Sequence, residues 1–150
     1  MSFSFVFGQK KYPTSDFRNP LDIPIILAGT FGELRSNHFH SGIDIKTQGK
    51  EGLKIYAAAD GYVSRIKVGE RGYGKCLYVY HPKTGHTSVY AHLQKFNPEI
   101  QAFVVKHQYE KQSYAIELFP VANQLVLKKG EVAAISGKEL HYSYSQEDFS

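Results

Sequence analysis

The sequence has a single cysteine among its 150 residues and no tryptophan. One thiol, Cys76, excludes an intramolecular disulfide and any zinc knuckle built from cysteines. It stands in the strand-like run KCLYVY, which predicts a buried and unreactive thiol. No apolar stretch reaches the roughly 20 residues that a membrane-spanning helix needs. We therefore expect neither a disulfide scaffold nor a transmembrane segment.

Basic blocks are also missing, although the formal net charge is +4 and the pI is about 9.0. The lysines and arginines are scattered, and no pattern typical of a nucleic-acid-binding module is present. We expect no nucleic-acid partner. A solvated basic surface explains the charge, and an anionic cell envelope is the alternative partner.

The composition that remains is that of one folded domain, with 42% hydrophobic and 14% aromatic residues. Strand-like runs flank Asp60-Gly61, a pair that favours a tight hairpin turn. Similar runs flank the turn residues Pro82–Gly85 and Lys129–Gly130. One helix is predicted, with Asn97 as the cap and Pro98 at the first helical position. The pattern predicts a mainly antiparallel β domain with one helical insertion.

The stretch HFHSGIDI carries the first chemistry-bearing pattern. His40 and Asp44 are four residues apart with Gly42 between them, so a bend at the glycine would bring both side chains to one ion. Imidazole and carboxylate are ligands that zinc accepts. A hydrogen-bonded polar cluster is the alternative. In the later run TSVYAHL, alternation predicts that His92 and Tyr90 share a face of a strand.

Taken together, these motifs resemble those of the lysostaphin-type (LytM-type) zinc metalloendopeptidases. The likeness rests on the H-x-G-x-D run, a hairpin of the form A-x-DG-x-V, the GYG turn, the YAHL strand and the segment KKGEVAAISG, in that order. It extends from about Phe31 to Gly137. An insertion around residues 97–125 resembles only some members.

The resemblance implies an all-β fold, an antiparallel β sandwich-barrel with one short helical insertion. It implies Zn2+ as the cofactor, with His40 and Asp44 as metal ligands and His92 as a catalytic residue beside them. The substrates would be peptidoglycan peptides of bacterial cell walls. Asn37, just before the first motif, is a candidate substrate-binding residue, and a solvated loop residue is the alternative.

The closing motif of the family, an H-x-H strand after a Gly- and Ser-rich loop, has no clear counterpart. After Gly137 the chain continues KELHYSYSQEDFS. In one interpretation ELHY is a shortened form of this strand, with His141 as the third metal ligand and Glu139 in place of the catalytic histidine. In the other, the family pattern ends at Gly137 and His141 is incidental. The second is favoured here, because Lys138 alone offers little reach for a returning strand.

The apolar start MSFSFVFGQ has small residues, Val6 and Gly8, before Gln9. It resembles the end of a secretory signal, and an ordinary first strand is the alternative. We predict a signal remnant at 1–8, an extended lead-in at 9–30, a peptidase-like domain at 31–137 and a divergent or truncated end at 138–150. We expect an exported protein of the periplasm or cell envelope.

The sequence thus predicts a zinc metalloendopeptidase domain acting on peptidoglycan, incomplete or inactive in this chain. The alternative is a catalytically degenerate module that binds or regulates other cell-wall hydrolases. A carrier domain that passes a phosphoryl group between histidines is a third class, and the carboxylate of the H-x-G-x-D run fits it poorly.

Overall fold

The computed structural model describes residues 16–23, 27–29, 43–47 and 50–145. Antiparallel strands and one helix make up these parts, which confirms the predicted all-β fold with a helical insertion. The strands are β1 (Leu27–Gly29), β2 (Ile43–Lys46), β3 (Lys54–Tyr56), β4 (Gly61–Val68), β5 (Lys75–His81), β6 (His86–Phe96), β7 (Ile116–Leu118), β8 (Val126–Leu127) and β9 (Val132–Ser145). The helix is α1 (Pro98–Lys111).

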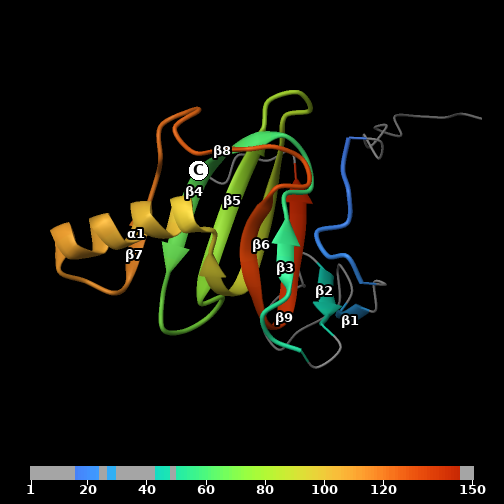
Figure 1. The fold of residues 1–150 in the computed structure, drawn as a ribbon, viewed down its shortest axis with the longest axis horizontal. Coiled ribbons are helices and arrows are strands. Elements are labelled where there is room, and N and C mark those ends of the chain that lie inside the picture. Colours follow the sequence, from blue (N-terminus) through green and yellow to red (C-terminus); the bar gives the residue numbers. More distant parts are fainter. Residues whose placement is uncertain (1–15, 24–26, 30–42, 48–49, 146–150) are drawn as a thin grey trace, which may run out of the picture.

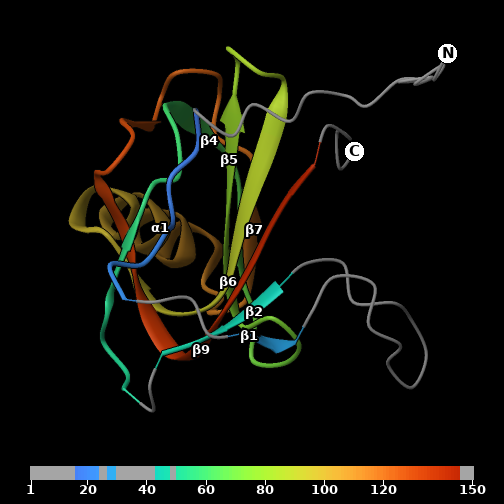
Figure 2. The ribbon, with the colours of Figure 1, turned by 90° about the vertical axis from the view of Figure 1, so that its right-hand side faces the viewer.

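The strands follow the order β1-β2-β9-β6-β5-β4-β7, with β3 also paired to β9 and β8 to β4. The last strand, β9, therefore lies between β2 and β6, which are far apart in the sequence (Figure 1). Figure 1 also shows α1 at the end of the molecule opposite β1 and β2. Viewed at a right angle, α1 lies to one side of β5 and β6 (Figure 2).

The two faces of the central strands bury different residues. The main core includes Leu77, Val79, Tyr90, Leu140 and Tyr142 on β5, β6 and β9. Cys76, Val89 and Ala91 form a second, smaller cluster from the intervening positions of β5 and β6. Because successive side chains of a strand point to opposite faces, this small cluster marks the face of the sheet away from the main core.

Local signals predict the β5–β6 hairpin and the helix correctly. The amide of Gly85, with φ of 73°, donates to the carbonyl of His81 at 2.8 Å and closes the turn. The side chain of Asn97 accepts a hydrogen bond from the amide of Ile100 at 2.9 Å, as expected of the cap of α1. The helix then packs on the sheet through Ile100 and Val104, both about 1% exposed.

The hairpin predicted at Asp60-Gly61 is wrong. β3 pairs with β9 and β4 pairs with β5, so the strands on either side of this turn do not pair with each other. Neither turn residue has a positive φ, which the expected turn type requires. The glycine serves a close approach instead, since a Cβ at Gly61 would lie 2.3 Å from the carbonyl oxygen of Tyr80.

The turn predicted at Lys129–Gly130 exists, but the strands beside it do not form a hairpin. The amide of Glu131 donates to the carbonyl of Lys128 at 2.9 Å. β8 then pairs with β4, whereas β9 pairs with β3, β6 and β2. The turn therefore redirects the chain from one part of the sheet to another.

Candidate functional site

His141 lies on β9 with only 3% of its surface exposed. Its register partners are Asp44 on β2 and Ala91 on β6, so the three positions form one row across three strands. Leu140 and Tyr142 belong to the main core, which leaves His141 on the opposite face, as Ala91 is. The backbone of Asp44 is described and its side chain is not. His40 and Asn37 lie outside the described residues.

β9 reaches this position without any returning loop. Between β6 and β9, Ala91 pairs with His141 and Leu93 pairs with Ser136, so one residue on β6 faces four on β9. Within that bulge, Glu139 and Leu140 pair with Lys46 and Ile45 of β2 instead. No strand has to be carried back by Lys138, so the expectation that this residue is too short is wrong. β9 continues forward beside β6, and its partner on the other side changes from β3 to β2.

His92 is the β6 residue opposite this bulge, and its φ of 59° is in the left-handed region. This conformation costs a residue with a side chain roughly 1–2 kcal/mol. It also breaks the alternation, so the prediction that His92 shares a face with Tyr90 is wrong. Tyr90 is fully buried in the main core, whereas His92 is exposed. The ring centroids of His92 and His141 are 6.3 Å apart.

Two neighbours fix the strained residue. The amide of His92 donates to the carbonyl of Tyr73 at 3.0 Å. On the other side, Gly137 comes so close that a Cβ there would lie 2.7 Å from the carbonyl oxygen of His92. Strained conformations persist where the surroundings over-determine them, and they cluster at functional sites.

Tyr73 is a site residue to which the sequence motifs gave no role, although it lies within the GYG turn. Its ring lies 5.6 Å from the ring of His92 and 5.2 Å from that of His141, between centroids. It stands between Gly72 and Gly74, whose φ angles are 70° and 62°. The two glycines in GYG were the available signal, because paired positive-φ residues mark a tightly folded turn.

The donor atoms available here suit zinc. Imidazole nitrogen and carboxylate oxygen are ligands it takes, and His141 stands opposite an aspartate. Within the described residues, no three His, Cys, Asp or Glu side chains gather closely enough to hold a metal. A three-ligand site at this position would therefore need His40 and the side chain of Asp44, neither of which the structure describes.

A hydrogen-bonded histidine–serine pair, His81 and Ser88, is also buried and does not form a reaction site. His81, about 1% exposed, places Nδ1 2.8 Å from the carbonyl of Asp60 and Nε2 2.8 Å from the hydroxyl of Ser88. A carbonyl can only accept, so Nδ1 carries the proton and Ser88 donates to Nε2. Tyr142 lies 3.2 Å from the same hydroxyl. Ser88 is itself fully buried, so no substrate can reach this pair.

Two other histidines and Cys76 have structural positions. His86 is buried and packs edge-on against the ring of Phe17. His107 is half-buried on α1, where its Nδ1 donates to the carbonyl of Phe103 at 2.8 Å. Cys76 is buried, and this burial raises the pKa of its thiol to about 11. A thiol of that pKa is a poor nucleophile at neutral pH.

Comparison with known proteins finds one sequence family. The sequence pattern of Peptidase family M23 matches residues 38–109. No curated protein sequence matches the chain. Within the described parts of the chain, none of the helical structure is long and apolar enough to cross a membrane.

Three solved structures have a similar fold. The antimicrobial peptidase lysostaphin from Staphylococcus simulans is 18% identical, with a TM-score of 0.58 over 84% of this chain and 44% of its own. The catalytic domain of the prophage-encoded M23 protein EnpA from Enterococcus faecalis, a mutant form, is 16% identical, with a TM-score of 0.53 over 81% and 80%. LytU is 23% identical, with a TM-score of 0.54 over 81% and 74%. The chain thus spans less than half of lysostaphin.

Proposed function

Since the chain contains a domain of peptidase family M23, we propose that it is a zinc-dependent endopeptidase that hydrolyses peptide bonds of bacterial peptidoglycan. The observation that carries the proposal is the row formed by Asp44 and His141 on adjacent strands, with the His92 ring 6.3 Å from that of His141. Residues directly opposite in an antiparallel pair lie on the same face. One ion between them would lie beside His92.

The metal ligands in this proposal are His40, Asp44 and His141. A bound zinc ion would act as a Lewis acid that polarises the peptide carbonyl and lowers the pKa of a water molecule. The burial of His141 supports a ligand role, because its ring is shielded from competing solvent on the same face as Ala91. Asn37 remains a proposed contact for the substrate.

The catalytic group in the proposal is His92. Its side chain is exposed, so a peptide can reach it, while its backbone is fixed by Tyr73 and Gly137. An imidazole nitrogen there would orient the attacking water and donate to the oxyanion that develops on the scissile carbonyl.

Glu139 is the feature that favours the second candidate function, a degenerate module that binds or regulates other cell-wall hydrolases. It precedes His141 by two residues and is exposed, at the place where the resemblance expects a second catalytic imidazole. A carboxylate carries negative charge at neutral pH and would repel a developing oxyanion. We therefore expect hydrolysis to be slow with Glu139 in place.

The proposed location follows from the proposed substrate. Peptidoglycan lies outside the cytoplasmic membrane, so the protein would act after export, in the periplasm or at the cell envelope. The formal net charge of +4 would favour attraction to an anionic envelope.

The test is the release of peptides from purified peptidoglycan, followed by mass spectrometry of the new amino and carboxyl ends. We expect slow release that stops when zinc is chelated and resumes when zinc is restored. His92→Ala should abolish release, whereas His107→Ala, on α1, should not. Binding of peptidoglycan without release, together with stimulation of another hydrolase, would favour the regulatory module.

A further inference from the structure

Tyr73 is in contact with both histidines that face the candidate site. Its ring is nearly perpendicular to that of His92, at an interplanar angle of 68°. It is closer to parallel with that of His141, at 34°. Aromatic rings at these separations attract one another in edge-on and offset arrangements. One side chain therefore restrains two imidazoles that come from different strands.

Hydrogen bonds fix the backbone around Tyr73. The turn between β4 and β5 is closed by the amide of Gly69, which donates to the carbonyl of Gly74 at 3.0 Å. The carbonyl of Tyr73 then accepts the amide of His92 at 3.0 Å. A Cβ on Gly72 or Gly74 would meet no atom within 4 Å, so their positive φ angles, and not a lack of space, explain the glycines.

We propose that Tyr73 is a positioning residue that sets the relative orientation of the His92 and His141 rings through its aromatic ring. Nothing else among the described contacts joins these two imidazoles to a common side chain. A site that must hold reacting groups to within about 0.5 Å depends on such supports. This inference rests on the proposed function of the two histidines, but the arrangement of their rings can be measured without any activity.

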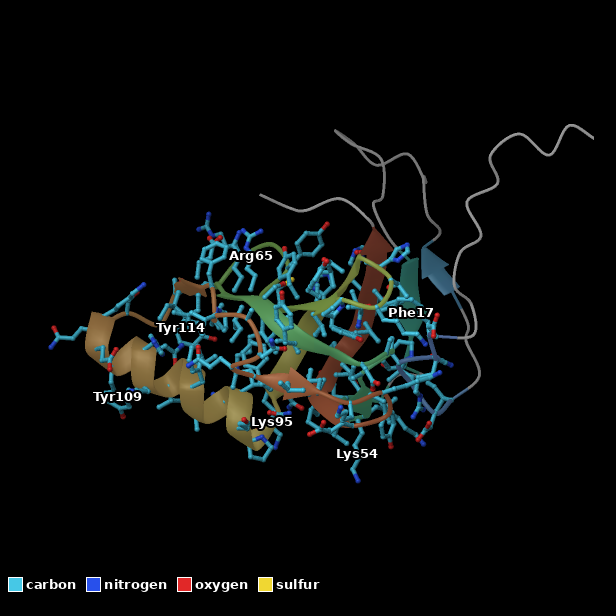
Figure 3. The ribbon with its side chains drawn as sticks, turned by 90° about the horizontal axis from the view of Figure 1, so that it is seen from above. Phe17, Lys54, Arg65, Lys95, Tyr109 and Tyr114 are labelled. Carbon is cyan, nitrogen blue, oxygen red and sulfur yellow. The ribbon has the colours of Figure 1, made fainter. Side chains whose placement is uncertain are left out.

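A role of the aromatic ring of Tyr73 and a role of its hydroxyl predict different results on substitution. If the ring carries the effect, phenylalanine replaces tyrosine without loss, whereas leucine, which is apolar but has no ring, does not. Tyr73 is 44% exposed and lies in a turn, so neither change removes a core residue. Tyr114, 53% exposed and beside α1, supplies the matched control (Figure 3).

The experiment compares Tyr73→Phe, Tyr73→Leu and Tyr114→Leu in the full chain. The first readout is the set of nuclear Overhauser effects between the ring protons of His92 and His141 in zinc-free protein, because loss of the tyrosine ring current alone would shift their resonances. We expect Tyr73→Leu to change these effects and Tyr73→Phe to preserve them. The second readout is peptide release, for which we expect Tyr73→Leu to lower kcat about tenfold with little change in KM, and Tyr73→Phe to retain it.

Unchanged nuclear Overhauser effects between the two histidine rings in Tyr73→Leu would overturn the proposal. Equal damage from Tyr73→Phe and Tyr73→Leu would also overturn it, because the hydroxyl would then be the active group. If none of the proteins releases peptides but the effects between the two rings change as expected, the proposed activity fails and the positioning role stands. Thermal unfolding of each variant shows whether the comparison is made on folded protein.

Discussion

Replacing Gly137 with alanine should damage both the stability of the sheet and the candidate site. The added Cβ would lie 2.7 Å from the carbonyl oxygen of His92, closer than the 3.0 Å that real Cβ atoms keep. That oxygen is backbone, so one of the two strands must move by a few tenths of an ångström. Displacements forced by overpacking cost about 1–3 kcal/mol. For a chain of this size, each kcal/mol lowers the Tm by about 2–4 °C.

The matched control is Gly69→Ala. Its Cβ would meet only the carbonyl oxygen of Arg71, at an ordinary 3.6 Å, and its φ is not in the left-handed region. Urea unfolding followed by circular dichroism gives the free energy of unfolding of both variants. Peptide release at a temperature where both remain folded reports on His92. The prediction is wrong if the free energy of unfolding of Gly137→Ala lies within about 0.5 kcal/mol of that of Gly69→Ala, which is the range of neutral surface changes.

Three further predictions follow from single groups. Glu139→His should raise the rate of peptide release at least about tenfold, because a neutral donor replaces a repelling carboxylate; an unchanged rate would show that Glu139 lies outside the reaction. Burial lowers the pKa of His81 below its ordinary value of 6.5, so the unfolded chain binds the proton more readily and the free energy of unfolding should fall as pH drops below about 6.5. Unfolding curves at about pH 7.5, about pH 6.5 and about pH 5.5 would show this fall. His81→Gln should make the free energy of unfolding less dependent on pH. Cys76, with its pKa raised to about 11, should resist a disulfide reagent at about pH 8 in the native protein and react on unfolding in urea; rapid native labelling would contradict its burial.

Sequence patterns predict this fold best where the signal is local. The cap at Asn97 and the turn at Pro82–Gly85 depend on residues within a few positions, and both are confirmed. The hairpin predicted from Asp60-Gly61 was wrong because glycine is needed there for the close approach of β5, a strand about 20 residues away. Partner choice among strands depends on the whole sheet, so a turn residue alone does not determine it.

The candidate site was also predicted best where the signal is local. The motifs identified His92, and the register of β9 brings His141 to the same face as the His92 ring, although alternation along β6 misplaced His92. That error has a physical cause, since one residue in a left-handed conformation reverses the order of faces. The role of Tyr73 depends on contacts between three separate elements, which no local pattern encodes.

We propose that His141 completes a zinc site with His40 and Asp44. Titration of the zinc-free protein with zinc, followed by calorimetry, tests this ligand set. We expect one ion per chain, affinity lowered at least about 100-fold in His141→Ala because one of three protein ligands is lost, and no change in His107→Ala. Zinc binding that is equally tight in His141→Ala and in the unaltered protein would contradict the claim.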